Sequence, residues 1–405
     1  MRSHRRRSAD EPGGAVGRFA SLEGYRGLAA LLIVVYHVYQ FMRSGPQSRY
    51  PLDGAPWHTA LIGLDSFVGL FFVLSAFLLA LPYARAGLAG ARPGSGRAFL
   101  YRRAVRIVPL YLVAILIVWS ARNRALPGDW RDLLEHLTFT QVFDDKRIFY
   151  TIGPAWSLAV EVHFYLLMVL LGGGAYRLCR RIATPRRRVV ALVAAAAGLG
   201  VASMLWKIVA WYLMGLGEQH WWVWFSLPAK LDLFAVGLVL AVVVAARGRD
   251  KPVTRPVRAA LAATGTLVVV LAFALRNPQP VPHVYFHTVT AVGFGLLLAA
   301  SVLTPPGSAG RILASPVPAL FGLISYSLYL WHEPVLLFLA DHHLFPVPGS
   351  PHAFVGGVLV LVPVATLVAW LSYWVIEYPT GMLRRSRGHE GELREYYEWA
   401  AGPRR

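Results

Sequence analysis

The chain alternates between long apolar runs and short polar segments that are rich in arginine. A helix needs about 20 apolar residues to cross a bilayer, and ten runs approach that length. These runs lie near residues 21–42, 59–83, 104–121, 156–176, 189–215, 222–246, 257–276, 284–303, 317–340 and 353–376. The pattern predicts an all-α fold, a bundle of about ten transmembrane helices. Segment 126–150 is too charged to span, so we expect it to lie in the interface or to re-enter the membrane.

Lysine and arginine gather in every second segment between the apolar runs. With the N-terminus placed inside, 29 of the 40 fall in inner segments and eight in outer segments. Because cytoplasmic loops are enriched in these residues, both termini are predicted to be cytoplasmic. The chain then divides into a disordered basic tail over 1–20, a transmembrane domain over 21–378 and a basic cytoplasmic tail over 379–405.

Composition narrows the class of protein further. The 405 residues are 56% hydrophobic and 15% charged, whereas soluble domains average about 25% charged. The net charge of +19 is distributed over the loops, which argues against a nucleic-acid-binding face. The single cysteine excludes an intrachain disulfide and a cysteine-based metal site. Richness in Ala, Arg, Gly and Pro is typical of a GC-rich bacterial genome, so the expected location is the bacterial plasma membrane.

The first apolar run, GYRGLAALLIVVYHVYQF, contains Arg26 and His37. Ionisable groups inside a membrane helix are costly, and they usually serve a function. Eleven residues separate the two, which corresponds to about three helical turns and about 16 Å of rise, so both side chains lie on one face. The predicted topology puts Arg26 near the cytoplasmic end and His37 in the outer half. This arrangement suggests a site that holds a long anionic ligand at one end and performs chemistry at the other.

Further ionisable residues are predicted in the outer half of the spans: Asp65, Glu161, Lys207, Lys230, Asp232 and His332. Together with His37 they indicate a polar, water-accessible cavity at one level of the bundle.

Some of these residues also have a purely structural interpretation. Lys230 and Asp232 either neutralise each other or serve a function. Asp65 is better interpreted as an interfacial helix cap than as a catalyst. Lys207 can extend its amine towards the interface. His332 precedes a proline and can owe its position to a kinked helix.

The run FLYRRAVRIVPLY places Arg102, Arg103 and Arg106 at the inner end of the third predicted span. Arg102 and Arg106 are four residues apart and therefore share a helix face. Arg26 lies at the same membrane level. Such a cluster suits phosphate groups, which form charge-assisted hydrogen bonds with arginine. Ordinary positive-inside topology is the alternative explanation, although Arg26 lies within an apolar run.

Six sequence blocks, in order from Leu22 to Pro379, resemble the acyltransferase-3 family, integral-membrane enzymes that O-acylate sugars, envelope polymers and macrolides. The blocks are EGYRGLAALLIVVYH, FFVLSAFLL, YRRAVRIVPLY, AWSLAVEVHFYLL, FGLISYSLYLWHEPV and VIEYP.

Several positions depart from the family pattern. Gly69 stands where an aspartate is common and Ala76 where a glycine is common, and Asp65, one helical turn earlier, is a candidate substitute for the missing acid. Val162 replaces the usual second acid after Glu161, which argues against paired carboxylates at that point.

The resemblance implies an acyl-CoA donor, acetyl-CoA in the simplest case, and no bound cofactor or metal. The hydroxyl acceptor would be a glycan, a glycolipid or a macrolide-like compound. His37, as general base or acyl carrier, would act with Arg26 and Glu161. The donor would be held by Arg26 and the cluster at residues 102–106. The residues assigned to substrate binding are Asp65, Trp156, Asp232, Tyr326, Trp331 and His332.

Two other classes of function are compatible with the sequence. A polytopic transporter also carries polar residues on broken helices, and Gly153-Pro154 is one candidate break. A non-catalytic membrane protein that retains the acyltransferase fold would explain the changes at Gly69 and Ala76.

Overall fold

The computed structural model describes residues 13–125, 127–248, 253–276, 282–303 and 308–386. These residues fold into helices and loops, with no β-strand in the described ranges. The α-helices are α1 (Gly13–Phe41), α2 (His58–Gly63), α3 (Phe67–Ala89), α4 (Gly96–Arg122), α5 (Trp130–Leu137), α6 (Ala155–Arg180), α7 (Pro185–Ile208), α8 (Trp221–Phe225), α9 (Leu227–Arg247), α10 (Arg255–Ala274), α11 (Pro282–Val302), α12 (Ser308–Leu313), α13 (Pro316–Leu323), α14 (Ser325–Asp341), α15 (Pro351–Ser372) and α16 (Tyr378–Ser386). Shorter helical segments are η1 (Leu64–Ser66), η2 (Gln141–Phe143), η3 (Val209–Leu213) and η4 (Tyr373–Glu377).

The all-helical prediction is confirmed, and each of the predicted apolar runs is helical. Within the described residues, eight continuous helical segments are long and apolar enough to cross a membrane. The pair α13 and α14 makes a ninth if it is counted as one bent span. Helix α1 corresponds to the first predicted run and is not among the eight. The exact number of spans and the cytoplasmic placement of the termini stay predictions.

The run predicted as a span over 317–340 is bent in the structure, and whether it crosses the membrane as one span stays a prediction. The structure breaks this segment at Ile324, where α13 and α14 meet at a bend of 70°. The segment 126–150 contains the short helix α5, which packs beside α4, and η2, which packs beside α6.

The ends of the described chain are more helical than expected. Helix α1 begins at Gly13, within the predicted tail, and α16 continues to Ser386. Residues 1–12 and 387–405, the remainder of both predicted tails, lie outside the described residues.

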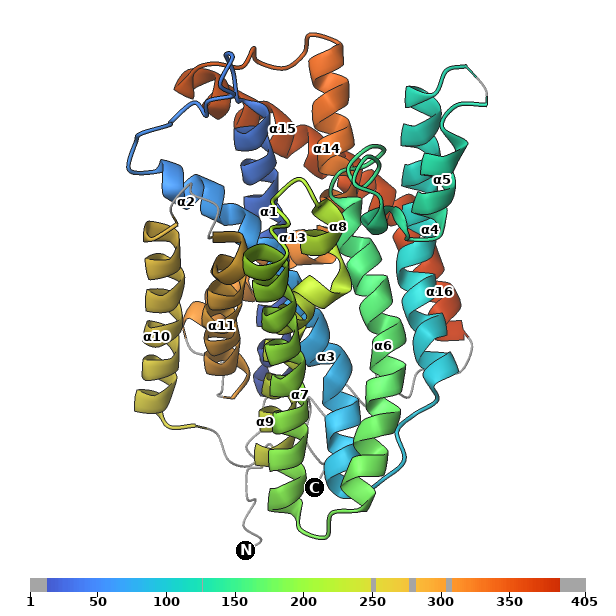
Figure 1. Cartoon of the computed structure of the whole chain (residues 1–405), viewed down its shortest axis with the longest axis vertical. Helices are drawn as coiled ribbons and strands as arrows, with labels where there is room; N and C mark the ends of the chain where they lie inside the picture. The colour runs from blue at the N-terminus through green and yellow to red at the C-terminus, as the bar shows by residue number, and fades with distance from the viewer. Residues whose placement is uncertain (1–12, 126, 249–252, 277–281, 304–307, 387–405) are drawn as a thin grey trace, which may run out of the picture.

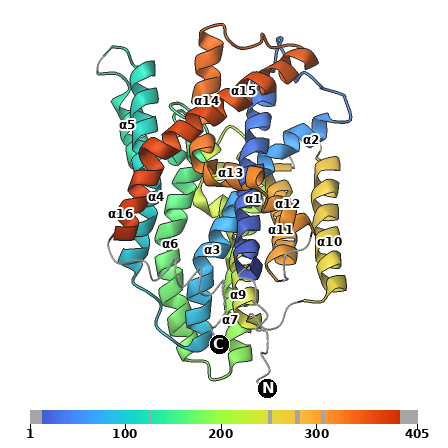
Figure 2. The same ribbon diagram turned by 180° about the vertical axis from the view of Figure 1, so that it is seen from behind.

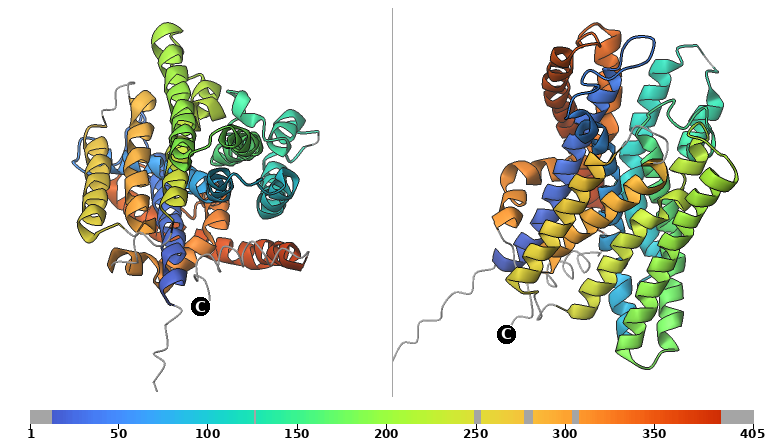
Figure 3. Two further views of the ribbon diagram at one scale, coloured as in Figure 1. Left: turned by 90° about the horizontal axis from the view of Figure 1, so that it is seen from below. Right: turned by 60° about the vertical axis from the view of Figure 1, so that its left-hand side comes forward.

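The helices surround a centre formed by α1, α3 and α9 (Figures 1 and 3). Helices α10 and α11 pack together on one flank, whereas α4, α5 and α6 lie on the other. Helix α15 crosses the back of the bundle at a tilt and continues through η4 into α16, which packs against α4 (Figure 2). One apolar core fills the space between α3, α4, α6, α9 and α11, and a second lies between α1, α14 and α15.

Helices α1 and α13 approach each other closely through glycine. A Cβ atom added at Gly27 would lie 2.6 Å from the backbone of both Gly322 and Pro318, and one at Gly322 would lie 2.2 Å from the carbonyl oxygen of Glu23. Small residues let membrane helices pack backbone to backbone. This contact fixes α13 against the lower half of α1, so α14 begins beside α1 after the bend.

We predict that Gly27→Ala lowers the thermal unfolding midpoint in detergent. The added methyl group meets rigid backbone, and overpacking of this kind costs about 1–3 kcal/mol. Gly174→Ala in α6 is the matched control, because no atom lies within 4 Å of its added Cβ and alanine favours a helix by roughly 0.5–1 kcal/mol. Equal midpoints for the two variants would contradict the close contact.

Candidate functional site

A buried cavity lies where α1, α3, α4, α6 and α14 converge. It holds about 80 Å³ of space for the centres of water molecules. Since one water needs about 10–15 Å³ on this measure, the cavity has room for several waters or a group of similar size. Its polar lining residues are Arg26, Ser75, Arg103, Arg106, Ser157, Glu161, Tyr165, Ser325, Tyr326 and Tyr329. We call it the arginine cavity.

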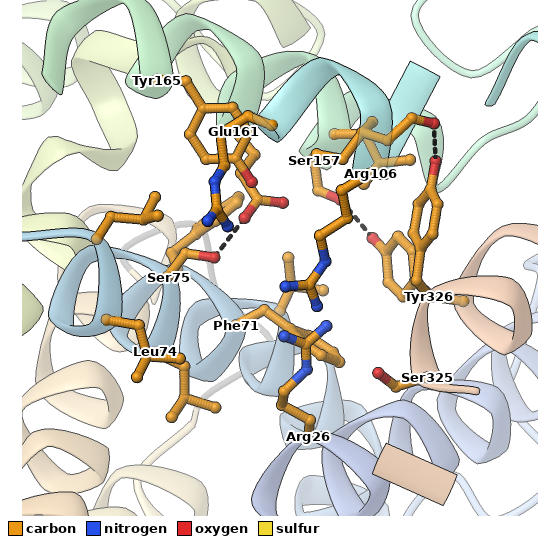
Figure 4. Close-up of a pocket in the computed structure, with 18 residues that line it drawn as sticks. Arg26, Phe71, Leu74, Ser75, Arg106, Ser157, Glu161, Tyr165, Ser325 and Tyr326 are labelled. Atoms are coloured by element: carbon orange, nitrogen blue, oxygen red, sulfur yellow. Dashed lines mark hydrogen bonds between the residues drawn. The ribbon is translucent and has the colours of Figure 1, made fainter. Parts of the chain in front are cut away.

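Two arginines face each other across the arginine cavity. Figure 4 shows the guanidinium groups of Arg26, from α1, and Arg106, from α4, pointing towards one another. The nearest carboxylate to Arg26 is that of Glu23, 3.9 Å from Nε, and Nε has no hydrogen-bond partner among the described residues. Buried charges are costly unless they are paired. Two cations that face one cavity suit an anionic ligand.

Glu161 is the single carboxylate among the described residues that line the cavity, opposite three arginines. It projects from α6 and accepts a hydrogen bond from the hydroxyl group of Ser75 on α3 (Figure 4). The lining thus carries a formal charge of +2, from Arg26, Arg103 and Arg106 against Glu161. This excess favours an anionic ligand.

A stripe of ring side chains on α14 leads from the arginine cavity to His332. Tyr326 lines the cavity and donates a hydrogen bond of 2.7 Å to the carbonyl oxygen of Ile107. Tyr329, three residues later, also lines the cavity and contacts His332, with ring centres 5.8 Å apart. Residues at this spacing share one helix face. The stripe therefore runs without interruption from the cavity to His332.

His332 and His37 form a direct pair between α14 and α1. His332 Nε2 lies 3.1 Å from His37 Nδ1, and the ring centres are 4.7 Å apart. His332 is fully buried, whereas His37 is partly exposed. The two residues are 295 positions apart in sequence, so the fold alone brings them together.

The hydrogen bonds of the pair determine which ring nitrogen carries the proton. His332 Nδ1 lies 3.2 Å from the carbonyl oxygen of Leu328, and His37 Nδ1 lies 2.9 Å from that of Ile33. A carbonyl oxygen accepts but does not donate, so in the neutral rings both Nδ1 atoms carry the proton. His332 Nε2 then accepts from His37 Nδ1. This leaves the lone pair of His37 Nε2 without a hydrogen-bond donor among the described residues.

Two predicted site residues lie differently from the other members of their predicted groups. Glu161, predicted to act with His37, accepts a hydrogen bond from Ser75, whereas His332 contacts the imidazole of His37. The physical reason is the bend at Ile324, which brings α14 beside α1. Arg102 was grouped with Arg106 as one face, yet Arg103 lines the cavity and Arg102 does not.

Besides His332, four residues predicted to bind substrate lie outside the arginine cavity. Asp65 forms a two-pronged ion pair with Arg276, at 2.7 and 2.8 Å, which accounts for its charge. Trp331 donates to the hydroxyl group of Ser372 at 3.0 Å. Asp232 and Trp156 belong to a separate cluster around α9.

Of the two alternatives for Lys230 and Asp232, mutual neutralisation does not match the structure. Asp232 instead pairs with Lys207 from α7, at 2.7 Å. Residues two apart on a helix point in different directions, so a lysine from the neighbouring helix reaches the carboxylate more directly.

Sequence reasoning missed Ser75 and Tyr329. Ser75 lies in the block FFVLSAFLL and Tyr329 in SYSLYLWH. The spacing of Tyr326, Tyr329 and His332 is a helical signal that would have indicated a shared face. No local signal in the sequence pairs Ser75 with Glu161, because that contact depends on how α3 packs against α6.

The geometry defines a helical membrane protein with a buried, basic cavity adjoining a histidine pair. Comparison with known proteins agrees: the model of the acyltransferase-3 family, described as an acyltransferase domain, matches residues 19–374. The chain belongs to the acyltransferase-3 family. No solved structure matches it significantly.

Curated relatives are distant. The chain is 24% identical over 375 residues to the O-acetyltransferase OatA of Staphylococcus aureus, covering 88% of this chain and 56% of OatA. It is 25% identical over 374 residues to BcsY of Komagataeibacter xylinus, provisionally named a membrane-bound transacylase, covering 89% of this chain and 82% of BcsY. The first relatives found are six proteins of S. aureus strains, provisionally named O-acetyltransferases and 23% identical; the chain spans 56% of their length.

Neutral substitutions of Arg26 and of Arg276 should differ in their effect on stability. We predict that Arg26→Gln leaves the thermal midpoint unchanged or raises it, because the ion pair of Arg26 is a 3.9 Å contact with Glu23, whose side chain is 48% exposed. Arg276→Gln should lower the midpoint clearly, since Asp65 loses its ion-pair partner, and breaking a buried pair costs about 3–5 kcal/mol. Thermal unfolding of both purified variants measures the difference. The opposite order would contradict the view of Arg26 as part of an anion-binding site.

Proposed function

We propose that this protein is a membrane O-acyltransferase that moves a short acyl group from acyl-CoA to a hydroxyl group. The observation that carries this proposal is the continuity of the site. The arginine cavity and the His332–His37 pair share Tyr329, which lines the one and contacts the other. This continuity supports a charged donor at one end and a proton acceptor at the other end of one path along α14 and α1.

The arginine cavity supplies the donor end. Arg103 and Arg106 on α4 and Arg26 on α1 would bind the CoA phosphates through charge-assisted hydrogen bonds. The cavity volume of about 80 Å³ suits a phosphate group or a short thioester and is too small for a whole CoA molecule. The nucleotide would therefore lie towards the end of the bundle that holds Arg103, with the thin pantetheine arm directed along α14.

His37 supplies the proton acceptor. With its Nδ1 proton shared between His332 and the Ile33 carbonyl, Nε2 is the atom left to act as general base. It would take the proton of the acceptor hydroxyl while that oxygen attacks the thioester carbonyl. The bond to sulfur then breaks, and the CoA thiolate takes up a proton as it leaves. His332 is a positioning residue in this scheme.

A covalent route uses the same lone pair. His37 Nε2 would attack the thioester, carry the acyl group and transfer it to the acceptor in a second step. The two routes differ in one observable, since the covalent route accumulates an acyl-enzyme when no acceptor is present. The hydroxyl acceptor, a glycan, glycolipid or macrolide-like compound, follows from the family and is not defined by the arginine cavity.

Variants on α4 test the donor site. We expect Arg103→Ala and Arg106→Ala each to raise the apparent KM for acetyl-CoA about tenfold or more, because each removes one charge-assisted contact of about 1.5–3 kcal/mol. Arg102→Ala is the matched control from the same helix, since Arg102 does not line the cavity. Steady-state hydrolysis of acetyl-CoA by the purified protein provides the measurement. A larger effect at Arg102 than at Arg106 would place the donor elsewhere.

Variants of the histidine pair test the catalytic end. His37→Ala should lower kcat by about 10²–10⁴-fold, the usual contribution of a general base. His332→Leu should lower kcat with little change in KM, because the donor contacts remain. His332→Gln should retain more activity than His332→Leu, since its amide oxygen can accept the His37 Nδ1 proton. Near wild-type turnover of His37→Ala would rule out the catalytic assignment.

A further inference from the structure

A second buried cluster lies between α7, α9 and α11, separate from the arginine cavity. Asp232 on α9 accepts hydrogen bonds from Lys207 at 2.7 Å, from Ser203 at 3.0 Å and from Thr288. Lys207 also donates to Thr288 at 2.9 Å. Asp232 is therefore fully engaged, and its charge is neutralised by Lys207.

Lys230, half a turn before Asp232, has no such partner. It is 8% exposed, and no described residue forms a hydrogen bond or an ion pair with its amine. Its Nζ atom lies 5.3 Å from the ring centre of Trp156 and 5.0 Å from that of Phe225. These rings attract a cation, but they leave its charge uncompensated.

The neighbouring charges do not supply the missing anion. Asp65 is held by Arg276 in a two-pronged ion pair. Asp65 and Asp232 are thus each matched by one cation, and Lys230 remains as a net positive charge buried in the bundle. A buried cation is stabilised by an anion that enters from outside the protein.

Lys230 opens into a small cavity with room for one to two water molecules, about 20 Å³ on the measure used above. Its lining residues are Lys207, Trp224, Phe225, Ala229, Lys230 and His287. Three of these six residues are aromatic or apolar, and Lys230 is the lysine whose amine has no ion pair among the described residues. A single carboxylate group matches this size and charge. Phosphate favours arginine forks, and these line the other cavity.

We propose that this second cavity is a carboxylate-binding subsite, in which Lys230 holds a carboxylate carried by the hydroxyl-bearing acceptor. The term acceptor rests on the proposed acyl transfer, whereas carboxylate binding does not. The two cavities are neighbours: Trp156, under the Lys230 amine, contacts Phe72, which lines the arginine cavity. The expected ligand is an acidic glycan or another hydroxy acid, and a neutral sugar would lack the anchoring group.

Saturation-transfer NMR of the full chain in detergent, without any acyl donor, tests this subsite. The probes are D-glucuronate and D-glucose, which differ in the carboxylate. We expect glucuronate to bind at least tenfold more tightly than glucose to the wild type, and Lys230→Met to abolish that preference. Lys146→Met, at an exposed lysine between η2 and α6, should retain it. Thermal unfolding and size-exclusion chromatography establish that each variant is folded.

Equal binding of the two sugars to the wild type would overturn the proposal, whether or not Lys230→Met is stable. Survival of the preference in folded Lys230→Met, or its loss in Lys146→Met, would also overturn it. Tighter, Lys230-dependent binding of glucose 6-phosphate than of glucuronate would contradict the carboxylate assignment. Because no donor is present, the absence of acyl transfer would leave these results unaffected.

Discussion

The backbone contact between α1 and α13 sets the position of both halves of the site. Glycines at 27 and 322 let the two helices meet without intervening side chains, and the chain then bends by 70° into α14. Because of this bend, α14 lies along α1 and presents Tyr326 and Tyr329 to the arginine cavity and His332 to His37. Loss of the close contact would displace the histidine pair and the cavity wall together.

Some charged side chains within the bundle have a close partner in the fold. Under the proposed function, others would be compensated by a bound anionic ligand. Asp65 and Asp232 are each satisfied by one cation from another helix. Arg26 pairs only at 3.9 Å with the exposed carboxylate of Glu23, Lys230 has no ion pair among the described residues, and each adjoins a cavity. Unpaired buried charges oppose stability, and strained or costly groups concentrate at functional sites. Under the proposed function, anionic ligands would offset the cost of these two cations.

The sequence predicted local features well and long-range contacts poorly. Apolar runs located the helices, and the spacing of Arg26 and His37 placed them on one helix, because both depend on local periodicity. The selection of Arg103 over Arg102 depends on the rotation of α4 within the bundle. The partner of His37 depends on the bend between α13 and α14, and the partner of Asp232 depends on the approach of α7. Such contacts between distant segments leave no periodic signal in a single sequence.

The central claim is that the arginine cavity and the histidine pair form one site for one ligand. An experimental structure of the protein with a non-hydrolysable acetyl-CoA analogue tests it most directly. The account predicts phosphate groups within hydrogen-bond distance of Arg103 and Arg106, a pantetheine arm passing Tyr329, and the carbonyl carbon near His37 Nε2. An analogue bound with its phosphates away from these arginines, or with its thioester remote from His37, would contradict it.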